Sequence, residues 1–104
     1  GPNGGKYGLL KYHFAEVVVR KGEVRVYVVE RDLKEIVQHV PELSVAYEIP
    51  GRQKRTALRL TRSGAGFVAP ITIPRGARRV NFYVQARLQG EKESGVVLYE
   101  PRRD

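Results

Sequence analysis

The chain has no cysteine, and this absence excludes several kinds of chemistry at once. Without thiols there are no disulfide bonds, no thiolate metal ligands and no cysteine nucleophile. Long apolar runs are also missing, since none approaches the roughly 18 residues that a membrane-spanning helix needs. At 104 residues the chain is expected to form a single domain, residues 1–104, that folds without a metal or a disulfide.

Sequence signatures of catalysis are missing as well. No phosphate-binding loop or dinucleotide fingerprint occurs, and Gly64-Ala65-Gly66 fits a turn. The acidic residues are scattered along the chain, whereas general acid–base catalysis needs them paired in a cleft. The chain is therefore predicted to be non-enzymatic, with no catalytic residue and no resident cofactor other than a divalent metal.

Alternating apolar and polar residues indicate several β-strands. The clearest run is VNFYVQARL at residues 80–88, in which every second side chain is apolar. Turn sequences such as Lys21-Gly22 and Pro50-Gly51 separate the runs, and a Pro-Gly pair is typical of a type II turn. This pattern predicts an all-β fold, an antiparallel immunoglobulin-like β-sandwich of about seven strands, with an open barrel as the alternative.

The same alternation predicts which side chains face the core. In the strand at residues 24–29, Val29 is assigned to the outer face, while the last strand turns inward either Val96 and Leu98 or Val97 and Tyr99. The expected inner-face residues are Val17, Val19, Val24, Val26, Val28, Leu43, Val45, Leu58, Leu60, Phe67, Ile71, Val80, Phe82, Val84 and Leu88.

Residues 31–43 depart from this alternation. Leu33, Ile36, Val37 and Val40 have helical spacing, and Asp32 is a residue type that caps helices. A helix and an irregular crossover are both compatible with this segment. We expect a crossover between the two sheets that contains one helical turn.

Positive charge dominates the composition. The chain has 19 basic and 11 acidic residues, a formal net charge of +8, which favours contact with anionic surfaces. Nucleic acid, anionic lipid headgroups, an acidic protein partner and a merely solvated surface all remain open. The candidate anion- or partner-binding residues are Arg52, Lys54, Arg55, Arg75, Arg78 and Arg79.

His13 and His39 are the two histidines of the chain. Zinc sites usually take three or four protein ligands, so a site here would need His13, Glu16 and a third residue from elsewhere. On one strand, side chains at positions 13 and 16 point to opposite faces. The residues themselves therefore favour His13 as an ordinary exposed or half-buried strand residue, with metal binding by His13 and Glu16 as the alternative.

Three short stretches resemble a small class of bacterial extracytoplasmic domains found near metal-efflux systems. They are Pro2-Asn3-Gly4-Gly5, Tyr12-His13-Phe14-Ala15-Glu16 and Val24-Arg25-Val26-Tyr27. The resemblance implies an immunoglobulin-like β-sandwich in a periplasmic adaptor or accessory protein of cation efflux. It also implies that His13 and Glu16 belong to a metal- or partner-binding patch. Asn3 stands where the pattern of that class has a histidine.

The resemblance and the strand pattern together lead to one functional prediction. The chain is expected to be a non-catalytic interaction or accessory domain of a bacterial envelope protein, linked to metal-cation efflux. Its partner would be a protein, and its location periplasmic or otherwise extracytoplasmic. The alternative is a basic module that binds nucleic acid or another polyanion. Gly1-Pro2 is typical of a protease-cleavage scar, so residues 1–6 are expected to be a tag remnant or unstructured.

Overall fold

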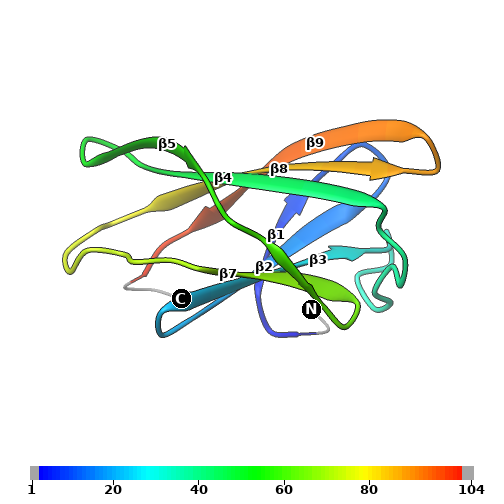
Figure 1. Cartoon of the computed structure of the whole chain (residues 1–104), viewed down its shortest axis with the longest axis horizontal. Coiled ribbons are helices and arrows are strands. Elements are labelled where there is room, and N and C mark those ends of the chain that lie inside the picture. The colour runs from blue at the N-terminus through cyan, green and yellow to red at the C-terminus, as the bar shows by residue number, and fades with distance from the viewer. Residues whose placement is uncertain (1–2, 102–104) are drawn as a thin grey trace.

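The computed structural model describes residues 3–101, which form β-strands and no helix (Figure 1). The all-β prediction is confirmed. Within these residues, no helix is long and apolar enough to cross a membrane. The strands are β1 (Lys6–Leu9), β2 (Phe14–Arg20), β3 (Glu23–Val29), β4 (Glu42–Ile49), β5 (Gln53–Ala57), β6 (Thr61–Ser63), β7 (Gly66–Pro70), β8 (Val80–Leu88) and β9 (Glu91–Tyr99).

The strands pair into two antiparallel sheets, with the orders β1-β2-β3-β7-β6 and β5-β4-β8-β9. The orders β2-β3-β7-β6 and β4-β8-β9 match strands A-B-E-D and C-F-G of a constant-type immunoglobulin domain. The predicted immunoglobulin-like sandwich is therefore confirmed. It has nine strands where about seven were expected, because β1 extends one sheet beside strand A and β5 extends the other beside strand C.

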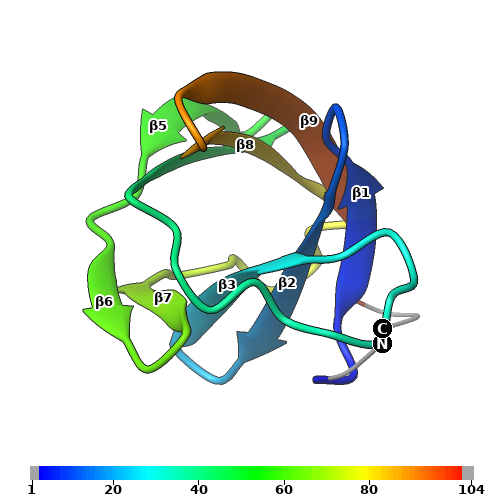
Figure 2. The same cartoon turned by 90° about the vertical axis from the view of Figure 1, so that its right-hand side faces the viewer.

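Strands β1 and β9 close one side of the sandwich, as the end-on view shows (Figure 2). Glycines allow this close approach. A Cβ atom on Gly8 would collide with the carbonyl oxygen of Val96, and one on Gly95 would collide with the carbonyl oxygen of Leu9. On the opposite side, residues 58–60 carry the chain from β5 in one sheet to β6 in the other.

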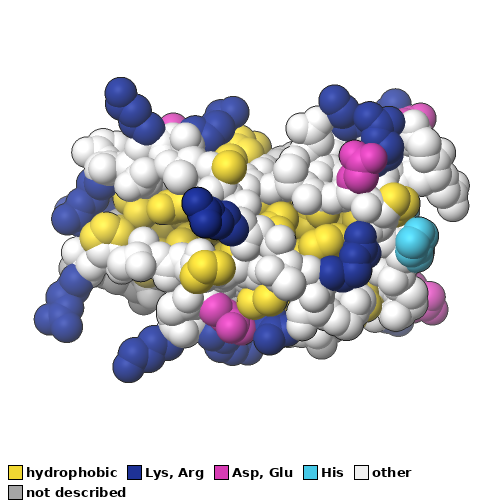
Figure 3. Space-filling model, viewed as in Figure 1, with side chains coloured by type: hydrophobic (Ala, Val, Ile, Leu, Met, Phe, Trp, Pro, Cys, Tyr) yellow, Lys and Arg dark blue, Asp and Glu magenta, His cyan; other side chains and the backbone are white. Residues whose placement is uncertain are grey.

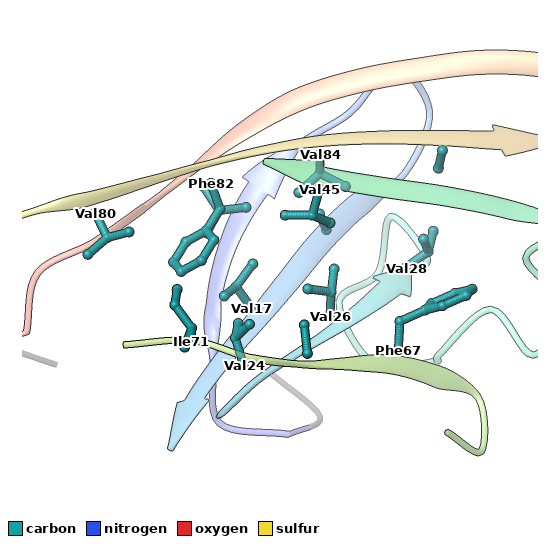
Figure 4. Packing of buried hydrophobic residues seen from close by; sticks show 14 of the residues in the cluster. Val17, Val24, Val26, Val28, Val45, Phe67, Ile71, Val80, Phe82 and Val84 are labelled. Carbon is teal, nitrogen blue, oxygen red and sulfur yellow. The ribbon is translucent and has the colours of Figure 1, made fainter. Parts of the chain in front are cut away.

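The core lies between the sheets (Figure 4). Phe82 and Val84 of one sheet meet Val17, Val26 and Ile71, which come from the other sheet and from the segment after β7. Every side chain expected on the inner faces belongs to this cluster or packs against it. The alternative left open for β9 is also resolved: Val97 and Tyr99 point inward, and Val96 and Leu98 are exposed.

The assignment of Val29 to an exposed outer face is wrong, because the crossover at residues 30–41 covers it. Val29 is fully buried and bridges Ile36, while the N–H of Val37 donates to the carbonyl of Val28. The crossover itself was predicted correctly, but its helical turn is absent. Leu33 adopts a φ of 60°, a left-handed conformation that interrupts a right-handed helical turn.

The expectation that residues 1–6 are unstructured is wrong for residues 3–6. Lys6 begins β1, and Asn3 and Gly5 donate hydrogen bonds to Glu16 on β2. Gly1 and Pro2 lie outside the described residues.

Candidate functional site

Glu93 on β9 is a buried carboxylate that holds the turn between β1 and β2. Its Oε1 accepts hydrogen bonds from the N–H groups of Lys11, Tyr12 and His13, at 3.0, 2.7 and 3.2 Å. Its Oε2 lies 2.8 Å from Nδ1 of His13. Burial by itself raises the pKa of Glu93, but hydrogen bonds from Tyr12 and Lys11 and the contact with His13 outweigh it and lower the pKa. The carboxylate is therefore ionised at neutral pH in the fold.

Glu16 on β2 is a second buried carboxylate, and it holds the opening stretch of the chain. It accepts hydrogen bonds from the backbone N–H and the Nδ2 of Asn3, at 3.1 and 3.0 Å, and from the N–H of Gly5 at 2.7 Å. A Cβ on Gly5 would collide with the carbonyl oxygen of Val17, so glycine is needed at this position. The Asn3-Gly4-Gly5 stretch is thus a structural element of the sheet.

The structure does not bring His13 and Glu16 together. His13 contacts Glu93 and, through Nε2 at 3.6 Å, Glu30, whereas Glu16 contacts Asn3 and Gly5. Among residues 3–101, no group of three or more His, Asp or Glu side chains is placed to hold a metal ion. Metal binding through His13 and Glu16 stays a prediction.

Three acids and the second histidine, His39, line the same hollow as His13, and this grouping was not predicted from the sequence. The hollow, of about 490 Å³, opens beside the His13 ring at this end of the sandwich. Its titratable lining residues are Tyr12, His13, Glu30, His39, Glu91 and Glu93.

Four of the six candidate basic residues lie at the opposite end of the sandwich. Arg52, in the turn after β4, donates from Nη1 to the carbonyl of Arg75 at 3.3 Å. Arg52, Arg78 and Arg79 line one hollow of about 570 Å³ there. The space-filling view shows Lys and Arg side chains around this end, on the left (Figure 3). The structure thus brings together Arg52, Arg75, Arg78 and Arg79.

Arg55 and Lys54 lie instead on β5, and Arg55 belongs to the outer face of the four-stranded sheet. Its guanidinium lies 3.6 Å from the centre of the Tyr83 ring. The Tyr83 hydroxyl donates to Oε1 of Glu48 at 2.7 Å, and Asn81 donates to the same oxygen at 3.2 Å. The bond from Tyr83, followed by that from Asn81, lowers the pKa of Glu48.

Apolar side chains lie around Arg55 and Tyr83. Val96 and Leu98 are 42% and 48% exposed, although both are large hydrophobic residues. The β8–β9 and β4–β8 registers place Val96 and Ala46 on either side of Tyr83. A shallow hollow of about 480 Å³ lies over this region. We define the outer face as Ala46, Arg55, Ala57, Tyr83, Val96 and Leu98.

Comparisons of the chain with protein-family models, with curated proteins and with solved structures find no match.

Proposed function

We propose that this chain is a non-catalytic interaction domain that binds a protein partner through the outer face. The observation that carries the proposal is the exposure of Val96 and Leu98 beside Tyr83 and Arg55. Exposed apolar residues that gather on one surface with a polar surround are typical of protein-binding sites.

The composition of the outer face suits this role. Tyr and Arg are the side chains that most often supply binding energy at protein interfaces. Arg55 is already held against Tyr83, so less conformational entropy is lost when a partner binds. Ser44, Gln85 and Ser94 border the same hollow and provide a polar rim.

The two buried acids support a non-catalytic role. Buried carboxylates are often catalytic, and Glu16 and Glu93 are the natural candidates here. Both, however, accept several hydrogen bonds from backbone N–H groups. These hydrogen bonds fix the N-terminal stretch and the β1–β2 turn.

The biological setting in this proposal is a bacterial envelope protein linked to metal-cation efflux. It is supported by the resemblance of residues 2–5, 12–16 and 24–27 to extracytoplasmic domains near efflux systems. A periplasmic or otherwise extracytoplasmic location follows from the same resemblance.

The test is capture and mapping of a partner. The chain is immobilised and exposed to an extract of the envelope of its source cells, and retained proteins are identified by mass spectrometry. A Val96→Glu/Leu98→Glu double variant should lose the partner that the unaltered chain retains, because two carboxylates would be buried in the interface. Tyr12→Ser is the matched control, since Tyr12 is 53% exposed but lies at the β1–β2 turn.

A partner that binds the double variant as well as it binds the unaltered chain would contradict the proposal. Chemical-shift mapping with the purified partner gives a second check, since the amides of β8 and β9 should shift most. Folding of each variant is confirmed beforehand by its NMR spectrum, so that loss of binding reports on the surface.

A further inference from the structure

One end of the sandwich gathers cations from three turns that are far apart in the sequence. We define the basic end as Arg20, Lys21, Arg52, Arg75, Arg78 and Arg79. Two hydrogen bonds hold the three turns together: Ile71 N–H donates to the carbonyl of Gly22, and Arg52 donates to the carbonyl of Arg75. The cations therefore share one surface in the folded chain.

Two acids lie near the basic end. Glu23, opposite Arg20 in the β2–β3 register, pairs with Arg25 at 2.8 Å, and Glu100 lines one hollow together with Arg78 and Arg79. Among residues 3–101, none of the six side chains of the basic end lies within ion-pair distance of a carboxylate. At the far end, Lys11 pairs with Glu91 at 3.3 Å, and Arg87 lies 3.8 Å from Glu42. In Figure 3 dark blue side chains project from the left end and magenta ones lie further toward the middle, while magenta and cyan side chains accompany the blue ones on the right.

Apolar side chains lie among these cations. Arg20, Lys21 and Arg75 surround a hollow of about 590 Å³ whose lining includes Ile73 and Pro74. A surface that mixes cations with apolar groups fits the interface of an anionic membrane, where phosphates and the first methylene groups lie close together.

We infer that the basic end binds the surface of an anionic phospholipid bilayer, with its arginines and lysine on the lipid phosphates. The end belongs to a body of 38 × 23 × 23 Å. The β4–β5 turn and the β7–β8 connection form the tip of its long axis, and the β2–β3 turn lies slightly behind them (Figure 1). Such a tip meets a plane more readily than it encloses a strand of nucleic acid. Binding of single strands also relies on aromatic stacking. Tyr99, which lines the same hollow as Arg20 and Arg75, packs against the core and is only partly exposed, and the exposed Tyr12 lies at the other end.

This membrane contact goes beyond the proposed function, because it uses a different surface. The outer face lies along the side of the sandwich, on β4, β5, β8 and β9. A domain whose basic end contacts the membrane would keep the outer face free for a partner. The two proposals can therefore fail independently.

The test is co-sedimentation of the whole chain with vesicles at low ionic strength. We expect binding to vesicles that contain phosphatidylglycerol and none to phosphatidylcholine alone. Each cation near an anionic surface strengthens binding about fivefold, so Arg75→Gln/Arg78→Gln/Arg79→Gln should weaken it about a hundredfold. The matched control is a triple variant that removes three exposed cations from the far end, Arg31→Gln/Lys34→Gln/Lys92→Gln.

The control variant should bind within about threefold of the unaltered chain, since its cations lie far from the surface relative to the screening length. A paramagnetic lipid should broaden the amide signals of Gly22, Gly51 and Gly76 and leave those of Gly64 and Gly90 sharp. Folding of both variants is checked by NMR.

Four results would overturn the inference: no binding to phosphatidylglycerol vesicles, equal losses in the two triple variants, displacement by inorganic phosphate at constant ionic strength, or tighter binding of DNA than of vesicles. The third would indicate a site for free phosphate, and the fourth a nucleic-acid surface.

Discussion

Nδ1 of His13 lies 2.8 Å from Oε2 of Glu93, although 80 positions separate the two residues in the sequence. An ionised carboxylate only accepts hydrogen bonds, so Nδ1 of His13 carries the proton in this contact. The other carboxylate oxygen accepts three backbone N–H groups from the same turn. Glu93 thus fixes both the turn that joins β1 to β2 and the orientation of the His13 ring.

Replacement of Glu93 by glutamine is expected to destabilise the fold by about 2 kcal/mol. The glutamine amide oxygen is a weaker acceptor, and its NH₂ group would face the protonated Nδ1 of His13. Urea unfolding measures the change. Glu91→Gln is the control, because Glu91 forms only an exposed ion pair with Lys11 and should change stability by less than about 1 kcal/mol. Equal effects of the two substitutions would contradict the role given to Glu93.

Acidification should remove the contribution of Glu93. The pKa of Glu93 is lower in the fold than in the unfolded chain, so the ionised carboxylate stabilises the fold above the unfolded pKa of about 4.3. This stabilisation is lost as the pH falls through the lower, folded value. We expect the urea midpoint of the unaltered chain to fall more steeply below about pH 4.3 than that of Glu93→Gln. Parallel curves would show that the pKa of Glu93 is the same in the folded and the unfolded chain.

The sheets of this protein were predictable from the sequence because most strands have one buried and one solvated face. That alternation identified the inner residues of β8 correctly. It failed for Val29, where the crossover buries the outer face as well. It also missed β1, whose residues Lys6–Leu9 do not alternate, because this strand is held by pairing with β2 and by glycine contacts with β9.

The partners of the two buried acids were not predictable in the same way. Once Val97 is known to point inward, the strand period places Glu93 inward too, and an inward carboxylate signals a structural or functional role. The choice between Val96 and Val97 depends on the packing of β9, which the sequence alone leaves open. The turn that supplies the N–H groups lies about 80 residues away, and only the closed sandwich brings it to Glu93.

Gly95→Ala should destabilise the protein by about 2 kcal/mol, because the new methyl group would collide with the carbonyl oxygen of Leu9. The direction of this stability change distinguishes a collision from an unstrained site. Gly→Ala at an unstrained site usually stabilises a protein through the unfolded chain. Thermal and urea unfolding measure the effect, and Ser94→Ala, on the exposed face of the same strand, should change stability little. A stabilised Gly95→Ala variant would mean that β1 does not approach β9 this closely in solution.

Tyr83→Phe should raise the pKa of Glu48, because the hydrogen bond from the Tyr83 hydroxyl is the largest cause of its lowering. Asn81 still donates to Glu48, so the pKa should stay somewhat below its ordinary value. A pH titration of the side-chain carboxyl signals by NMR measures the shift. The carboxylate of Asp32 is an internal control, since its pKa is lowered mainly by the N–H of Lys34 and should not move.

The same variant separates the two roles of Tyr83 on the outer face. Phenylalanine keeps the ring under Arg55, so Tyr83→Phe should retain the captured partner, whereas Tyr83→Ala removes the ring and should lose it. Loss of the partner in both variants would mean that the hydroxyl and Glu48 take part in recognition. Retention in both would remove Tyr83 from the binding surface and leave Val96 and Leu98 as its centre.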